Sequence, residues 1–317
     1  MKISVLIPAY NCAATIQLTL DSVFAQTVQA DEILVLNDGS TDETLKILVS
    51  NKPRVTVLSQ ENTGLGGARD ALCSAAQGDL IAFLDSDDLW HPRYLEAQRR
   101  LRDEYPDAVA YFTKHHEFTG EGDFRWESDP LRERTVVEVM QPAEFIERYA
   151  KWGRLCLCSK LCVPSHILSS LGAQPFKLRL CEDVYFLHRL IRLGPAVYLP
   201  TAIVAYRIRD GSLSSNLLGL AQAGLSALEL LGQRFETLSE ASIRRAFSFS
   251  LRARRRWLIR ILLGLGETNL ARKQLLRGIR YESLGSKARY LRLLILSYLP
   301  SSLQPKWPSA RREGRIP

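Results

Sequence analysis

The chain has 317 residues, of which 46% are hydrophobic and 24% charged, so it is long enough to bury a full core in one large domain with an appendage. The N-terminal apolar run is too short for a signal peptide, and no window reaches about 18 uncharged apolar residues, so neither a secretory leader nor a spanning helix is expected. Six cysteines without a CxxC pair favour free buried thiols in a reducing cytoplasm over zinc sites or disulfides.

The first hundred residues alternate between strand-like and helix-like patterns. Strands are predicted at residues 3–7, 32–36, 55–58 and 80–84, and helices at 13–26, 42–49 and 66–76. Because the strands are solidly apolar, this alternation indicates an α/β fold with a parallel sheet covered on both faces.

The rest of the chain continues with mixed elements and then becomes helical. Helices are predicted at residues 91–105, 142–152, 164–171 and 184–193, strands at 108–116, 155–163 and 197–206, and a polar loop or hairpin at 119–129. Residues 217–298 read as successive helices rich in Leu and Arg. We therefore predict an α/β domain over residues 1–215 and a basic helical C-terminal region over 216–317.

The net charge of +8 is concentrated in that C-terminal region. Residues 215–317 hold 19 of the 42 Lys and Arg residues but only 6 of the 34 Asp and Glu residues. Such asymmetry indicates an anionic surface, either membrane or nucleic acid, as a partner. No recognised motif or aromatic-basic platform supports nucleic-acid binding, so we expect no nucleic-acid partner.

Polar residues follow three of the predicted strands. They are Pro8-Ala9-Tyr10-Asn11, Asn37-Asp38-Gly39-Ser40 and Asp85-Ser86-Asp87-Asp88. Ligands of open α/β sheets bind outside the carboxyl ends of the strands. These three segments can therefore address one ligand.

The carboxylates of Asp85, Asp87 and Asp88 are crowded into one turn. Their mutual repulsion predicts a positive group between them. Oxygen ligands at a strand end suit Mn²⁺ or Mg²⁺, especially a cation that substrate phosphates also hold. The alternative is an Asp-rich turn that caps the next helix.

Three further segments each allow a binding and a structural interpretation. The glycine-rich loop 60–69 can bring its backbone close to an anionic ligand, with Arg69 reaching a base or phosphate, or it can be a tight turn. The pair Glu182-Asp183 can supply a general base or cap a helix. Arg207 and Arg209, in the loop 206–214, can clasp a diphosphate or lie in a solvated turn.

Six blocks in this order resemble glycosyltransferase family 2, the inverting sugar transferases with the GT-A fold. They are VLIPAYN (5–11), DEILVLNDGSTDET (31–44), ENTGLGGARDAL (61–72), GDLIAFLDSDDLW (78–90), CEDVYFLHRLIRLG (181–194) and YRIRDGSLS (206–214). The resemblance covers about residues 1–215 and implies a glycosyltransferase catalytic domain there.

The resemblance also implies roles for single residues. Pro8, Ala9 and Tyr10 would line the nucleotide pocket, Asp38 would hydrogen-bond the base, and Arg69 would lie near the base or phosphates. Asp85 and Asp87 form the family's DxD motif, with Asp87 as a metal ligand and Asp85 reaching the ribose or the metal. Asp183, beside Glu182 in the ED motif, matches the catalytic base. Many members have a histidine where Arg209 or a neighbour stands here, so a direct contact of Arg207 and Arg209 with the phosphates is expected.

The expected reaction is metal-dependent, inverting transfer of a sugar from a nucleotide diphosphate sugar, by family habit a UDP-sugar. The acceptor would be a hydroxyl of a glycan or lipid-linked molecule in polysaccharide or cell-envelope glycan synthesis. The alternatives are a non-catalytic nucleotide-sugar-binding module and a nucleotidyltransferase. Residues 244–299 either lie on the inner face of an anionic membrane, in a cytoplasmic peripheral protein, or form a helical extension whose arginines stay in water.

Overall fold

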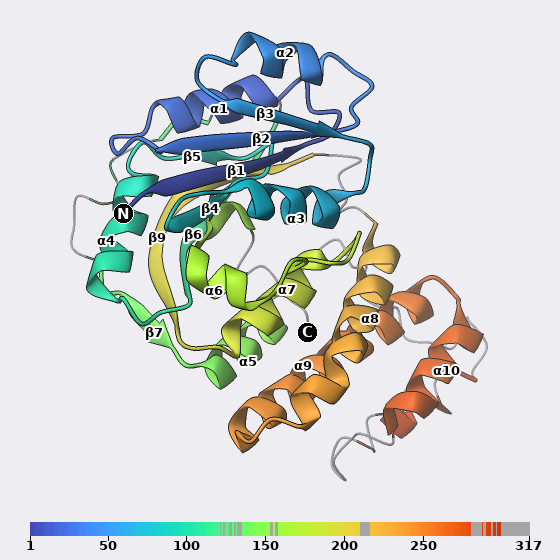
Figure 1. Ribbon diagram of the computed structural model, residues 1–317. Coiled ribbons are helices and arrows are strands. Elements are labelled where there is room, and N and C mark those ends of the chain that lie inside the picture. The colour runs from blue at the N-terminus through green and yellow to red at the C-terminus, as the bar shows by residue number, and fades with distance from the viewer. Residues whose placement is uncertain are drawn as a thin grey trace. The chain divides into compact units, whose positions relative to one another are not determined.

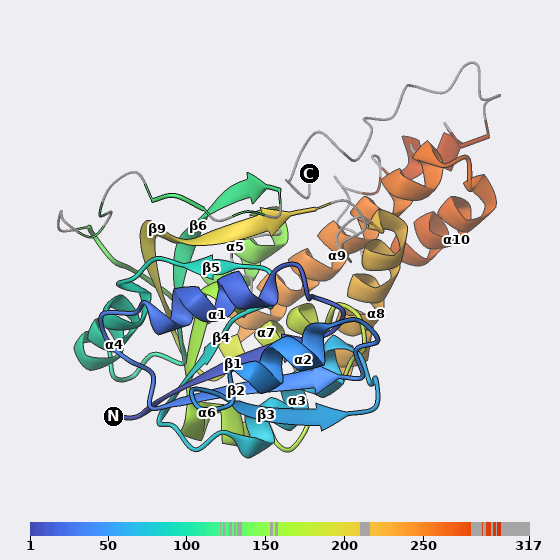
Figure 2. The same cartoon turned by 90° about the horizontal axis from the view of Figure 1, so that it is seen from above.

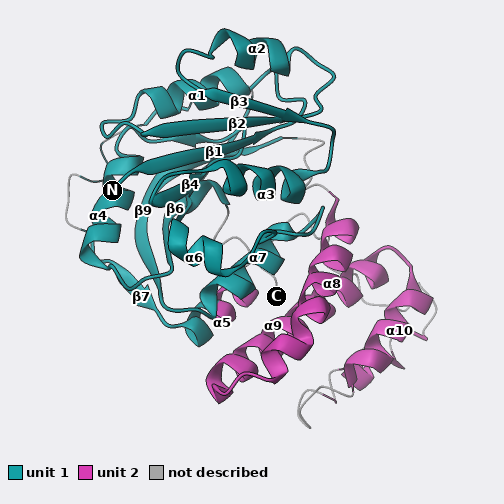
Figure 3. Ribbon diagram, in the orientation of Figure 1, with its two compact units in different colours: residues 1–145, 156–210 teal, residues 146–155, 211–317 magenta. Residues whose placement is uncertain are grey.

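The computed structural model divides the chain into two compact units, residues 1–145 with 156–210 and residues 146–155 with 211–317 (Figure 3). It describes residues 1–120, 122, 124–126, 129, 131, 135–152, 155, 158–209, 216–279, 287, 290–292, 294, 295, 297 and 298. The domain boundary was predicted after residue 215, and residues 210–215, which precede it, lie outside the described residues.

The described strands of the first unit form one nine-stranded sheet (Figure 1). In spatial order they are β3 (Thr56–Gln60), β2 (Glu32–Asp38), β1 (Ile3–Ala9), β4 (Leu80–Phe83), β8 (Leu161–Pro164), β6 (Ala110–Thr119), β9 (Ala196–Ile208) and β5 (Leu89–Trp90), and β7 (Glu138–Met140) pairs with β9. The first four are mutually parallel, β8 is antiparallel to both of its neighbours, and β6 is parallel to β9. β5 and β7 are antiparallel to β9, but the parallel pairings contain most of the paired residues, so the sheet is mostly parallel, as predicted.

Helices cover both faces of this sheet. On one face lie α1 (Ile16–Phe24), α2 (Thr44–Ser50) and α4 (Tyr94–Glu104), and on the other α3 (Leu65–Ala75), α6 (Ser165–Ser170) and α7 (Glu182–Ile191) (Figure 1). Side chains alternate along a strand. Accordingly Val5 and Ile7 of β1 join the core beneath α1, whereas Leu6 faces the other side.

The structure corrects three local predictions. The strand predicted at residues 155–163 begins only at Leu161, after a 3₁₀ turn over Cys158–Lys160. The helix predicted from residue 184 begins at Glu182, so both residues of the ED pair belong to the first turn of α7. The strands β5 and β7 were missed because two and three residues are too few for a recognisable period.

The second unit is helical in its described part. It contains α8 (Leu217–Glu236), α9 (Ala241–Gly264) and α10 (Thr268–Ile279), together with residues 146–152 of α5 (Pro142–Trp152). Asn216 caps α8 by accepting a hydrogen bond from the Gly219 N–H, 3.0 Å away. None of the helices in the described ranges is both long enough and apolar enough to cross a membrane.

Candidate active site

The carboxyl ends of β1 to β4 meet at one edge of the sheet, because these strands are parallel (Figure 2). Pro8 and Ala9 are buried at the end of β1, and Tyr10, which follows, is 49% exposed. The loops after β1 and β2 are joined through Asn11. Its N–H donates to Ser40 Oγ (3.1 Å), and its side-chain oxygen accepts from the Thr41 N–H (2.8 Å). The first two predicted strand-end segments therefore form one surface.

Asp38 is buried at the end of β2 and organises the glycine-rich loop. Its carboxylate accepts hydrogen bonds from the N–H groups of Thr63 (3.0 Å) and Gly64 (2.9 Å) and from the Gln60 amide (2.7 Å). These bonds hold the loop against the end of β2. A hydrogen bond from Asp38 to a nucleotide base stays a prediction.

Asp85, Asp87 and Asp88 separate into different environments. Asp88 is fully buried and accepts a hydrogen bond from the Arg207 N–H (2.9 Å), and burial raises its pKa well above the usual range. The pKa of Asp87 is raised by burial and by Asp85. The turn itself is held by Ser159, whose Oγ accepts from the Asp85 N–H (3.0 Å). Asp88 is therefore a structural member of the turn.

A buried arginine lies between two of the predicted carboxylates. Arg69 of α3 contacts Asp85 Oδ1 through Nη2 (2.5 Å) and Glu182 Oε1 through Nη1. The Arg69 side chain is 2% exposed, that of Glu182 6% and that of Asp85 28%. Of the three crowded aspartates, Arg69 contacts only Asp85, and a cation between Asp85 and Asp87 stays a prediction. Arg69 ties the turn after β4 to the start of α7.

Glu182 and Asp183 differ in their surroundings although they are adjacent. Burial raises the pKa of Glu182 to about 7 against the opposing effect of Arg69. Successive helical residues point about 100° apart, so Asp183 does not share the direction of Glu182, and it is half-buried. The helix cap itself is Cys181, which forms no side-chain capping bond. Glu182 and Asp183 are therefore not the N-cap residues. They lie in the first turn of α7, where negative charge interacts favourably with the helix dipole.

The two arginines at the end of β9 have different partners. Arg207 is buried and donates from Nε to the Asp87 carbonyl (2.7 Å) and from Nη1 to the Gly122 carbonyl (3.0 Å). Arg209 is 40% exposed and pairs with Asp87 Oδ2 at 2.9 Å. Arg207 thus fastens neighbouring segments, whereas Arg209 contacts the carboxylate predicted to bind metal. The remainder of the predicted loop, residues 210–214, lies outside the described residues.

The donor set suits a hard divalent cation that shares its coordination with a ligand. Asp85 and Asp87 supply carboxylate oxygens, the type that Mg²⁺ and Mn²⁺ prefer. Within the described ranges, no three His, Cys, Asp or Glu side chains form a ready metal cluster. A cation held by Asp85 and Asp87 would take its further ligands from water and from substrate phosphates, which is a common arrangement for Mg²⁺.

Two residues of the 3₁₀ turn belong to the site but were not predicted. Ser159 holds the Asp85 N–H, and its carbonyl accepts from Trp90 Nε1 (2.8 Å). The Cys158 thiol lies within the electrostatic reach of Arg69, Asp85, Glu182 and Asp183, and burial raises its pKa well above the usual range. No signal in the sequence marks them, because the segment carries no motif.

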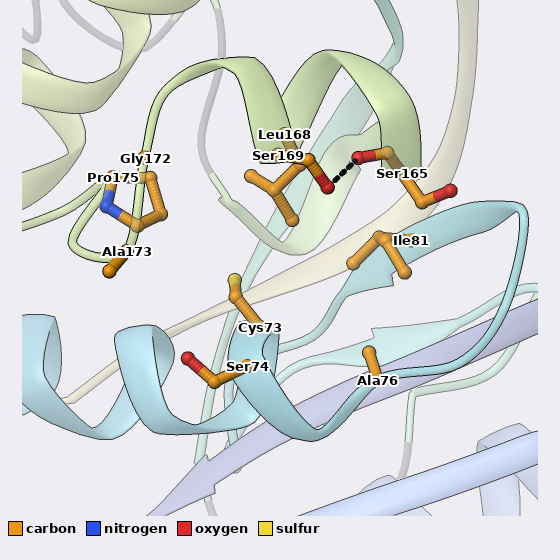
Figure 4. A pocket seen from close by; sticks show the side chains of 10 residues that line it. All are labelled: Cys73, Ser74, Ala76, Ile81, Ser165, Leu168, Ser169, Gly172, Ala173 and Pro175. Atoms are coloured by element: carbon orange, nitrogen blue, oxygen red, sulfur yellow. Dashed lines mark hydrogen bonds between the residues drawn. The ribbon is translucent and has the colours of Figure 1, made fainter.

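A separate cavity of about 360 Å³ lies between α3 and α6 (Figure 4). Its lining is Cys73, Ser74, Ala76, Ile81, Ser165, Leu168, Ser169, Gly172, Ala173 and Pro175. None of the predicted site residues is among them. The candidate site is therefore the carboxyl edge of the sheet and not this cavity.

The family assignment agrees with this geometry. The family described as "Glycosyl transferase family 2" matches residues 4–162. The glycosyltransferase GlyA of Streptococcus pneumoniae serotype 4 is 31% identical over 227 residues, which are 67% of this chain and 31% of GlyA. The chain belongs to glycosyltransferase family 2, and it spans about a third of the length of GlyA.

A second relative and a solved structure extend the comparison. WfgD of Escherichia coli, a UDP-Glc:alpha-D-GlcNAc-diphosphoundecaprenol beta-1,3-glucosyltransferase, is 41% identical over 98 residues, 30% of this chain and 39% of WfgD. The structure of Staphylococcus aureus TarS 1–349 in complex with UDP-GlcNAc aligns with a TM-score of 0.70 and 19% identity, covering 93% of this chain and 84% of that one. This likeness confirms the predicted GT-A fold.

Proposed function

We propose that this glycosyltransferase transfers a sugar, with inversion, from a nucleotide diphosphate sugar to a hydroxyl of a glycan or lipid-linked acceptor. The observation that carries the proposal is the Asp85–Arg69–Glu182 bridge, which joins the DxD turn to the helix that bears Asp183. A UDP-sugar donor and a role in polysaccharide or cell-envelope glycan synthesis are supported by the names of WfgD and of the TarS complex.

In the proposed reaction Asp183 is the general base. It takes the proton of the acceptor hydroxyl, whose oxygen attacks the anomeric carbon while the nucleoside diphosphate leaves from the opposite face. One displacement inverts the configuration. Asp183 suits this role because Glu182 is buried against Arg69, whereas Asp183 is half-buried at the helix start.

Asp87 and Arg209 would receive the diphosphate. Asp87, with Asp85, would hold Mn²⁺ or Mg²⁺, which when bound offsets the negative charge of the leaving group. Arg209 cannot ligate a cation, but its partly exposed guanidinium can hydrogen-bond phosphate oxygens. We therefore expect the Arg209–Asp87 pair to open when donor and cation bind.

A screen of nucleotide sugars with Mn²⁺ tests the proposed function. We expect one nucleotide sugar to raise the melting temperature, because a ligand that binds only the folded state stabilises it. Hydrolysis of that donor in the presence of Mn²⁺ would distinguish an enzyme from a binding module. If no nucleotide sugar stabilises the protein, the proposed donor class is wrong.

Asp87→Asn should abolish the dependence of donor binding on Mn²⁺. The substitution removes a charged oxygen ligand but keeps the size of the side chain, and titration calorimetry with and without Mn²⁺ measures the effect. Asp88→Asn is the matched control, because the neutral amide can still accept the hydrogen bond from the Arg207 N–H. Full Mn²⁺ dependence in Asp87→Asn would remove Asp87 from the metal site.

The C-terminal unit is proposed to bind the inner face of an anionic membrane. Leu291, Ile295 and Tyr298 are 50%, 59% and 66% exposed and recur at the spacing i, i+4, i+7, beside exposed Lys287 and Arg292. Apolar side chains flanked by cations are typical of helices that lie on anionic lipid surfaces.

Flotation of the full chain with phosphatidylglycerol vesicles, in about 0.15 M salt, tests this proposal. We expect co-flotation that Leu291→Asp with Ile295→Asp abolishes. Leu230→Asp, an exposed leucine of α8, is the control and should float like the wild type. Wild-type protein that stays unbound would favour the alternative of a helical extension with its arginines in water.

A further inference from the structure

The connection between α6 and α7 brings one basic side chain, that of Arg179, to the candidate site. We call residues 171–181 the strap. Arg189 of α7 donates from Nη1 to the carbonyls of Gln174 and Pro175 (3.1 Å each) and from Nη2 to that of Leu171. One buried guanidinium thus satisfies three carbonyls of the strap.

The strap is also fixed to α3 and to the core. The Asp70 carboxylate accepts hydrogen bonds from the N–H groups of Phe176 (2.9 Å) and Lys177 (3.1 Å). The ring of Phe176 is buried and stacks on Phe186, with centroids 4.1 Å apart, and meets Phe83 edge-on at 5.5 Å. The strap is therefore a built part of the fold.

The strap packs directly against the glycine-rich loop. A Cβ atom at Gly66 would lie 1.8 Å from the Leu178 carbonyl oxygen, and one at Gly64 would lie 2.6 Å from Arg179 Cγ. Gly64 also has a φ of +82°, which favours glycine. These glycines are explained by the approach of the strap, which the tight-turn interpretation does not include.

Arg179 is an exposed arginine that this packing holds at the carboxyl edge. Its Nη2 donates to the Asn62 side-chain oxygen (2.9 Å), and the Asn62 amide donates to the Asp38 carbonyl (3.1 Å). Two left-handed residues, Lys177 (φ 54°) and Cys181 (φ 55°), flank it in the strap. Such conformations persist where the surroundings enforce them, and they often accompany functional sites.

Among the described residues, no carboxylate forms an ion pair with Arg179 that would offset its charge. Arg69 and Arg209 each contact a carboxylate, whereas Arg179 forms no ion pair in the part of the chain that the structure describes. A guanidinium carries five N–H donors in a fixed fork that fits phosphate oxygens. Arg179 also lies beside Gly64, where α3 begins, and helix N-termini favour anionic groups.

We infer that Arg179 binds the diphosphate of the nucleotide donor. This inference rests on the proposed function and adds a phosphate contact that belongs neither to the DxD and ED motifs nor to the loop with Arg207 and Arg209. If Arg179 had only a structural role, in which its aliphatic part covers Gly64, its positive charge would not be needed. The two roles therefore differ in how neutral substitution affects binding of charged and uncharged ligands.

Arg179→Gln is the test variant, because glutamine keeps much of the aliphatic part and a donor for Asn62 but removes the charge. The probe is the nucleoside diphosphate, among UDP, GDP, ADP and CDP, that binds the wild type in the presence of Mn²⁺, and its nucleoside serves as the uncharged probe. We expect the diphosphate Kd to rise about tenfold or more, the scale of a charge-assisted hydrogen bond, and the nucleoside Kd to stay unchanged. Calorimetry and ligand-observed NMR measure the two.

Arg99→Gln, on the exposed surface of α4, is the control and should change neither Kd. An unchanged diphosphate Kd in Arg179→Gln, or an equal loss of nucleoside and diphosphate binding, would overturn the inference. A wild type that binds none of the four nucleoside diphosphates would instead overturn the proposed function. Equal melting temperatures of the variant and the wild type would confirm that the fold is intact.

Discussion

Asp183→Asn is expected to lower donor turnover by about 10²–10⁴-fold, the usual contribution of a positioned general base. Nucleotide binding should change little, because Asp183 would act on the acceptor and not on the nucleotide. The adjacent Glu182 cannot replace it, since its carboxylate is buried against Arg69. Release of the nucleoside diphosphate from the donor identified by screening measures turnover, and calorimetry measures binding.

The control for this experiment is Asp103→Asn, which changes an exposed carboxylate on α4 by the same chemistry. It should leave turnover and binding at wild-type values. Turnover near the wild-type rate in Asp183→Asn would exclude Asp183 as the base. Loss of nucleotide binding together with turnover would instead indicate that Asp183 helps to form the donor pocket.

Arg69→Met is expected to destabilise the protein by roughly 3–5 kcal/mol, the range found when one partner of a buried ion pair is removed. The reason is that Glu182 and part of Asp85 would remain buried without their shared cation. Activity should fall as well, because the bridge positions the DxD turn relative to α7. The midpoint of urea denaturation measures the loss.

Adding Glu182→Gln to Arg69→Met should restore part of the lost stability, because it removes one of the two stranded charges. Lys46→Met is the surface control, since the Lys46–Glu43 pair is exposed and its loss should not move the midpoint. A midpoint of Arg69→Met equal to that of the wild type would show that the bridge does not stabilise the fold.

Much of the architecture was predictable because its signals are local. The alternation of apolar strands and helical periods predicted β1 to β4 and α1 to α3 within a few residues. The short strands β5 and β7 escaped, since their pairing with β9 comes from the fold and not from a pattern of their own. The turn at Cys158–Lys160 was wrongly predicted as part of a strand, because no motif in the segment marks it as a turn.

The sequence identified residues of the site but not the groups that each of them contacts. The motifs singled out Arg69, Asp85 and Glu182, yet Arg69 was expected to contact a base or phosphate. In the structure it contacts two carboxylates. Arg207 was expected at the diphosphate, and the structure places its guanidinium on the carbonyls of Asp87 and Gly122.

The sequence by itself determined the fold class, the order of the elements and the family to which the chain belongs, because these depend on periodicity and on short contiguous motifs. Only the tertiary structure decided that Arg69 joins Asp85 to Glu182, a residue 113 positions after Arg69 in the chain. It also decided that the strap brings Arg179 onto Gly64. Contacts over such separations depend on how the helices pack on the sheet, and no local pattern specifies that packing.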